Sequence, residues 1–155
     1  MKKKVLCFGE VLWDNFPCYN EIGGAPLNVA LHLKKLGIDS EIISRVGNDI
    51  MGDKILDYLE KFNFDTSLIQ LDKRYKTGEV TVSLDKKKSV EYEIKYPCAW
   101  DKIEISINYF KIIEKFDFFV FGSLISRDRI SNETLVKLIN YAKYKIFDVN
   151  IREPF

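Results

Sequence analysis

Five positions of this sequence carry the chemistry of a site for neighbouring hydroxyl groups. Asp14 follows an apolar run near the N-terminus, the pair Gly23-Gly24 stands directly before a helical pattern, and Asn150 and Arg152 follow the last apolar run. A carboxylate accepts hydrogen bonds from two adjacent hydroxyls, an amide both donates and accepts, and glycines let backbone N–H groups approach a ligand. Together these residues predict a polyol site.

Each of these residues also has a simpler interpretation when it is taken alone. Asp14 is compatible with a loop carboxylate that closes a turn, and residues 23–26 with a plain helix start that has proline near its first turn. Asn28, in the first helical turn, is compatible with an exposed or locally bonded side chain, and Arg152 with a surface charge. The residues alone leave both alternatives open.

The site forms only if the fold brings these segments to one edge of a sheet. Apolar runs predict buried strands at residues 5–8, 41–47, 67–71, 117–124 and 144–150. Helical periodicity predicts helices at residues 26–36, from about 49, at 106–115 and from 131. This alternation is typical of an α/β fold with a parallel sheet and flanking helices, in which ligands bind beyond the carboxyl ends of the strands.

Capping residues set the expected ends of the helices. Gly37 is placed for a left-handed C-cap, and Asp49, Ser106 and Ser131 for N-caps. In "VGNDIMG" a turn followed by the Asp49 cap is favoured over a phosphate loop, because the sequence has no G-x-x-x-x-G-K-[ST] and no G-x-G-x-x-G after a strand. On the helix that begins at Ser106, the spacing places Ile107, Phe110 and Ile113 inward.

Residues 77–96 interrupt this alternation. The stretch "TGEVTVSLDKKKSVEYEIKY" contains two alternating runs around a polar turn, which predicts an antiparallel hairpin with one solvated face, added to the main sheet. Tyr92, Tyr96 and Trp100 have two interpretations, since aromatic rings there either cover a bound sugar or pack in strands and core.

Composition excludes several classes of function. The 155 residues suit one domain, and 24 Lys+Arg against 23 Asp+Glu give a net charge of +1, which argues against nucleic-acid and membrane-surface partners. No signal peptide or membrane-spanning run is evident. Three widely spaced cysteines favour reduced thiols in a cytoplasmic protein over disulfides or a metal site.

Several motifs occur in one order along the chain. "GGAPLNVALHLKKLG" followed by "SRVGNDIMG" resembles the N-terminal signature of the PfkB (ribokinase-like) family of carbohydrate kinases. "GEVLWD", "TGEVTVSL", "PCAWD" and "FDVNIR" fall in the family's order, and the GGAPxN form is more similar to fructokinases than to ribokinases or nucleoside kinases. The resemblance covers essentially the whole chain and implies a ribokinase-like fold.

This resemblance implies an ATP-dependent transfer of the γ-phosphoryl group to a hydroxyl of a small-molecule sugar, with ATP and Mg²⁺ as cofactors of the complete enzyme. The family's sugar-binding positions map onto Asp14, Gly23, Gly24 and Asn28. Arg152 would lie near the transferred phosphate, and Asn150 on the side of the metal and phosphate. Residues at about 14–22 and 77–96 resemble the family's lid, which closes over the sugar and can form contacts in a homodimer.

The family's catalytic aspartate lies in a G-A-G-D segment of the C-terminal half, which this sequence does not contain. The magnesium segment and the adenine pocket also belong to that half. Residues 1–155 are therefore expected to form a single incomplete α/β domain, truncated after its last strand, with no catalytic residue and no metal site of its own. A lost general base removes about 10²- to 10⁴-fold in rate, so no meaningful kinase turnover is expected from the chain alone.

Two other functions remain open at this point. One is a non-catalytic sugar-binding or oligomerisation module whose hairpin pairs with another chain. The other is a kinase for another ketose or for a keto-deoxy sugar acid, because these motifs recognise polyols and do not fix the sugar.

Overall fold

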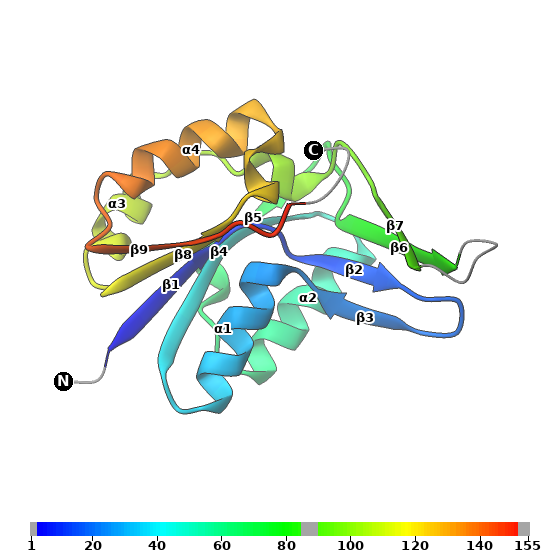
Figure 1. The fold of residues 1–155 in the computed structure, drawn as a ribbon, viewed down its shortest axis with the longest axis horizontal. Coiled ribbons are helices and arrows are strands. Elements are labelled where there is room, and N and C mark those ends of the chain that lie inside the picture. Colours follow the sequence, from blue (N-terminus) through cyan, green and yellow to red (C-terminus); the bar gives the residue numbers. More distant parts are fainter. Residues whose placement is uncertain (1–2, 85–89, 152–155) are drawn as a thin grey trace.

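Figure 1 shows a computed structural model of the chain, which describes residues 3–84 and 90–151. One sheet has five parallel strands in the order β5-β4-β1-β8-β9. The strands are β1 (Lys4–Phe8), β4 (Asp39–Gly47), β5 (Ile69–Asp72), β8 (Phe118–Gly122) and β9 (Tyr144–Asp148). The α/β fold predicted from the alternating pattern is thereby confirmed.

Helices cover both faces of this sheet, with α1 and α2 on one side and α3 and α4 on the other (Figure 1). Their bounds are α1 (Ala25–Lys35), α2 (Ile50–Lys61), α3 (Ile107–Ile113) and α4 (Arg129–Ile139). Successive side chains of a strand point to opposite faces. In β1, Cys7 accordingly packs with Leu27 and Leu59 from α1 and α2, whereas Phe8 packs with Leu135 from α4 on the other face. β1 and β8 are almost entirely apolar because both of their faces are covered.

Most predicted helix ends are confirmed. The carboxylate of Asp49 accepts a hydrogen bond from Gly52 N at 2.9 Å, and the Ser106 hydroxyl accepts one from Asn108 N at 3.3 Å. Gly37 follows α1 with φ +75°, the left-handed conformation of a C-cap. These polar side chains thus satisfy N–H groups that have no partner within the helix.

Two predictions about the second helical layer are wrong. The N-cap of α4 is Asp128, whose Oδ1 accepts from Ile130 N at 3.0 Å, whereas Ser131 lies buried inside the helix. The Ser131 hydroxyl donates instead to Trp100 O at 2.7 Å, so tertiary contacts use this side chain. In α3, Ile107 is 75% exposed because the short helix turns Tyr109 and Ile113 toward the core.

A second sheet extends from one end of the first (Figure 1). Its order is β3-β2-β6-β7, with β3 (Asn20–Gly23), β2 (Leu12–Asn15), β6 (Gly78–Leu84) and β7 (Val90–Ile94). The predicted antiparallel hairpin is confirmed as β6-β7, and Val80 and Val82 form its buried face together with Leu12. The sequence patterns did not predict that β6 also pairs with β2, in parallel.

Short connections join the second sheet to the first. Trp13 Nε1 on β2 donates to Met51 O in α2 at 3.1 Å, and the Thr77 hydroxyl just before β6 donates to Asp49 at 2.7 Å. Three 3-10 turns complete the path of the chain: η1 (Thr66–Leu68), η2 (Ala99–Lys102) and η3 (Leu124–Arg127). The same Asp49 that caps α2 therefore also fixes the entry to the hairpin.

Strand β9 is the most exposed strand of the main sheet, since all five of its residues are solvent-exposed. Ile146 and Phe147, on its opposite faces, are 47% and 53% exposed. Within residues 3–84 and 90–151, no helix has the length and apolar character needed to cross a membrane.

Candidate functional site

A pocket of about 480 Å³ lies where the carboxyl ends of β1, β8 and β9 meet the second sheet. Its walls combine the β1–β2 connection, the start of α1 and the inner face of the hairpin. The polar residues that line it are Glu10, Asp14, Asn28, Tyr92, Ser123, Asp148 and Asn150. Ligands of open parallel sheets bind at this kind of edge, so the topology favours a binding site here.

The fold brings most of the predicted residues to this pocket. Asp14, Gly24, Asn28 and Asn150 all line it, although they come from three separate stretches of the chain. Gly23 lies directly beside Asp14 without lining the pocket. Arg152 falls outside the residues that the structure describes. The roles of these residues in binding a sugar stay a prediction.

The two adjacent glycines are required for different reasons. A Cβ on Gly23 would overlap Oδ2 of Asp14, whose carboxylate fills the space that a side chain would need. A Cβ on Gly24 would overlap the backbone oxygen of Glu10, and Gly24 also has φ +116°, which side chains rarely adopt. Thus Gly23 makes room for the Asp14 carboxylate, and Gly24 lets the start of α1 approach the end of β1.

Asp14 and Asn28 present their polar atoms from different supports. Asp14 is half-buried on β2, in register with Glu21 of β3 and Val80 of β6. Asn28 is exposed in the first turn of α1, where its backbone N–H donates to Gly24 O at 2.9 Å. The exposed Asn28 side chain does not pack in the core. Both Asp14 and Asn28 lie on regular secondary structure.

Sequence reasoning missed Glu10, although it lies at the carboxyl end of β1 like the residues that were selected. Glu10 is 3% exposed, and its Oε1 accepts a hydrogen bond from Ala25 N at 3.2 Å. Burial raises the pKa of the Glu10 carboxyl to about 7. The signal that could have found it is the position of a glutamate directly after Gly9, where β1 ends.

Tyr92, Tyr96 and Trp100 had two interpretations from the sequence, either covering a ligand or packing within the protein, and the structure places them differently. Trp100 is completely buried, and the Arg127 guanidinium stacks 3.9 Å from its ring centroid. Tyr96 donates its hydroxyl to Asp128 Oδ2 at 3.0 Å. Tyr92 lines the pocket and is 54% exposed, so it is the aromatic side chain placed to contact a ligand.

Comparison with known families matches residues 3–155 to one described as pfkB family carbohydrate kinase. The chain belongs to this family. An uncharacterized sugar kinase from Pyrococcus horikoshii is 37% identical over 133 residues, which span 84% of this chain and 43% of that protein. A 6-phosphofructokinase from Thermoanaerobacterium thermosaccharolyticum, described as ATP-dependent, is 34% identical over 92% of this chain and 47% of its own length.

Solved structures agree with this family membership. The P. horikoshii sugar kinase in complex with ATP has a TM-score of 0.85 at 32% identity, covering 96% of this chain and 53% of that chain. A fructokinase from Halothermothrix orenii has a TM-score of 0.83 at 27% identity, covering 93% and 56%. The fold of this carbohydrate-kinase chain is therefore ribokinase-like, and the chain spans about half the length of the relatives it matches.

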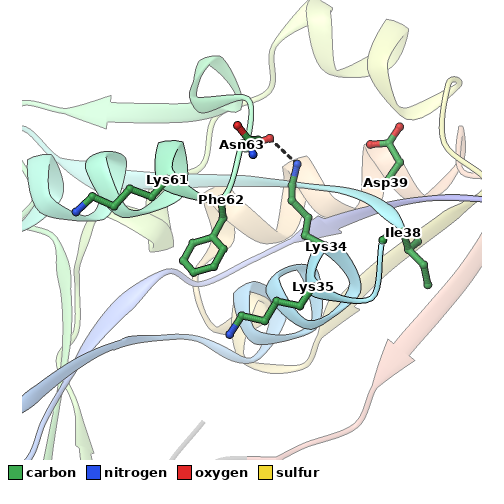
Figure 2. Close-up of a pocket in the computed structure, with 8 residues that line it drawn as sticks. Lys34, Lys35, Ile38, Asp39, Lys61, Phe62 and Asn63 are labelled. Carbon is green, nitrogen blue, oxygen red and sulfur yellow. Dashed lines mark hydrogen bonds between the residues drawn. The ribbon is translucent and has the colours of Figure 1, made fainter.

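A second pocket, of about 490 Å³, lies at the opposite end of the sheet in this pfkB-family chain (Figure 2). Lys34 and Lys35 come from the last turn of α1, and Lys61 from the last turn of α2. Lys34 Nζ donates to Asn63 O at 2.6 Å and to Glu41 Oε1 at 2.8 Å. Positive side chains stabilise the negative ends of helix dipoles, so this arrangement is explained without a ligand.

The residues near the carboxyl ends of the strands offer few ligands for a metal. In the described ranges 3–84 and 90–151, no three His, Cys, Asp or Glu side chains cluster closely enough to hold an ion. Asp148 is the last residue of β9 and Asn150 follows it, and Asn150 N donates to Asp148 Oδ1 at 3.1 Å. These two side chains face the same pocket as Asp14.

Proposed function

We propose that this chain is the sugar-binding half of an ATP-dependent, fructokinase-like sugar kinase, which transfers the γ-phosphoryl group of ATP to a sugar hydroxyl. The observation that carries the proposal is the pocket itself, where Asp14, Gly24, Asn28 and Asn150 meet at the carboxyl ends of the strands. Family membership and relatives named as sugar kinase and fructokinase support the same conclusion.

The chemistry of Asp14, Asn28 and the pair Gly23-Gly24 suits a neutral polyol. The Asp14 carboxylate accepts hydrogen bonds from two neighbouring hydroxyls, and the Asn28 amide both donates and accepts. Gly23 leaves space for the Asp14 carboxylate, and Gly24 lets backbone N–H groups reach the ligand. We assign all four residues to sugar binding and place the reacting hydroxyl toward Asn150 and Arg152, on the phosphate side.

ATP supplies the phosphoryl group in this proposal, and the P. horikoshii relative has a structure with ATP. Ser123 directly follows β8, Asp148 ends β9 and Asn150 follows it, and these polar side chains of the pocket would face the phosphates. Magnesium would need ligands in addition to the Asp148 carboxylate, because Mg²⁺ requires six oxygen ligands and no metal-binding cluster occurs among the described residues. A C-terminal half like that of the longer relatives is the proposed partner that completes both sites.

Sugar binding is testable on the 155-residue chain. We expect D-fructose to raise its thermal unfolding temperature, and Asp14→Asn to abolish this shift while the unfolding transition itself remains cooperative. Glu21→Gln is the matched control, because Glu21 lies opposite Asp14 in the adjacent strand but does not line the pocket. A series of ketoses and keto-deoxy sugar acids extends the test to the other substrates. A shift that survives Asp14→Asn contradicts the assignment.

Kinase turnover by the chain alone is expected to be absent, because nucleotide positioning and the general base are most of what phosphoryl transfer requires. A coupled assay for ADP release, with ATP, Mg²⁺ and D-fructose, measures this. Sugar-dependent ATP consumption by the purified chain would show that the described half is sufficient.

The second candidate function is a non-catalytic sugar-binding or oligomerisation module. The exposed apolar residues of β9 favour it, as does the open edge strand β7 of the proposed lid, which could pair in a homodimer. Light scattering at increasing concentration tests association, and a monomer throughout the series contradicts it. A cytoplasmic location, favoured by the free cysteines, belongs to both candidates.

A further inference from the structure

Glu10 is buried in the wall of the sugar pocket, and among the described residues only one of its two carboxylate oxygens accepts a hydrogen bond. Its side chain lines the pocket and is 3% exposed. Oε1 accepts a hydrogen bond from Ala25 N, whereas the buried Oε2 has no hydrogen-bond partner in the described part of the chain. A buried carboxylate with an unsatisfied oxygen is costly, so this glutamate needs an explanation.

The N-terminus of α1 lacks a capping side chain of its own. Its N-cap residue is Gly24, and its first turn contains no acidic residue. The dipole and the N–H groups of an uncapped first turn make such a helix end attractive to anions. The Glu10 carboxylate already occupies this place from 15 residues earlier in the chain, through its bond to Ala25 N.

The surrounding pocket is also negative. Asp14 and Asp148 line it together with Glu10, and no Lys or Arg is among its described lining residues. Two charged groups act on Glu10 from neighbouring elements, Arg127 in η3 and Asp148 at the end of β9. Arg127 is already engaged with Asp101, through bonds of 2.6 and 2.8 Å. A second anion near the start of α1 would therefore be repelled by these carboxylates.

We propose that Glu10 is a positioning and selectivity residue: it holds the start of α1 against the end of β1 and makes the pocket accept neutral sugars while rejecting sugar acids and sugar phosphates. This inference rests on the proposed sugar-binding function and narrows its substrate class.

Sulfate, a dianion throughout the neutral range, probes the helix end without requiring sugar binding. At about pH 8 we expect Glu10→Gln to bind sulfate about tenfold more tightly than the wild type, measured by thermal shift, because the amide keeps the acceptor for Ala25 N–H and removes the charge. Asp53→Asn is the matched control, since Asp53 is an exposed acidic residue in the first turn of α2. It should not change sulfate binding at the pocket.

The pH dependence separates the charge of Glu10 from a purely structural role. Because burial raises the pKa of Glu10 to about 7, lowering the pH from about 8 to 6 neutralises most of the carboxylate. Sulfate affinity of the wild type should then rise toward that of Glu10→Gln, whereas the variant should respond little. The wild-type comparison holds even if the variant fails to fold.

The sugars then test selectivity directly. At about pH 8 the wild type should prefer D-fructose over D-fructose 6-phosphate, and Glu10→Gln should reduce this preference about tenfold. Equal sulfate affinity in wild type and variant, without pH dependence, overturns the role of Glu10. Absence of D-fructose binding in both proteins contradicts the proposed function instead, while the sulfate series still decides on Glu10.

Discussion

The buried ion pair between Arg127 and Asp101 offers a quantitative test of how the hairpin is held to the main sheet. The Arg127 guanidinium donates to both carboxylate oxygens, from Nε at 2.6 Å and from Nη2 at 2.8 Å. The side chains are 1% and 0% exposed. Arg127 Nη2 also donates to Lys95 O at 2.8 Å, directly after β7. The pair therefore joins η2, η3 and the end of the hairpin.

Replacing Arg127 by Met leaves the Asp101 carboxylate buried without its cation. Breaking a buried pair on one side costs about 3–5 kcal/mol, and we expect a value near the lower end because Asp101 Oδ2 still accepts from Cys98 N at 2.8 Å. Domains of this size have a total free energy of unfolding of about 5–15 kcal/mol, so the loss is a large part of it. The double variant Arg127→Met/Asp101→Asn should recover much of it, because no buried charge remains.

Urea unfolding followed by tryptophan fluorescence measures these differences, since Arg127 stacks on the Trp100 ring. The matched control is Arg129→Met, which breaks the exposed pair Arg129–Glu133, with side chains 77% and 52% exposed. That change should cost about 0.5 kcal/mol or less. If Arg127→Met lies within about 1 kcal/mol of the wild type, or if the double variant recovers nothing, the buried charge is not what stabilises this junction.

Three further predictions concern the site and the exposed strand. The pKa of Glu10 rises on folding from 4.5 to about 7. The free energy of unfolding therefore falls as the pH increases through this range, and above it the buried charge costs about 3 kcal/mol. Glu10→Gln should unfold at a higher urea concentration than the wild type at about pH 8, and at the same concentration at about pH 4. Gly24→Ala should lose about 1–3 kcal/mol in the same assay and weaken D-fructose binding, whereas Gly37→Ala, with φ +75° but open space around it, should lose stability without affecting the sugar. Phe147→Lys should reduce concentration-dependent association in light scattering, because this half-exposed ring lies on the open strand β9.

The sequence by itself determined the layered fold and most of the site. Unbroken apolar runs such as that of β1 indicate strands covered on both faces, and the carboxyl ends of parallel strands necessarily meet at one edge. That rule predicted that Asp14, Gly24 and Asn150 would meet, and all three line one pocket, although Asp14 reaches it from β2 of the second sheet. Helix ends were predictable where a cap is local, as at Asp49, because its acceptor and donor are three residues apart.

Tertiary structure alone decided the contacts between residues that are distant in the chain. Ser131 has the right type for a cap, but its hydroxyl bonds to η2 across 31 residues, and Asp128 takes the cap instead. The parallel pairing of β2 with β6 has no local pattern, since both strands alternate in the same way whatever their neighbour. Gly23 and Gly24 also differ only in space: one accommodates the Asp14 carboxylate and the other the backbone of Glu10. Local patterns indicate which side chains most segments bury, whereas packing decides which distant atoms they meet.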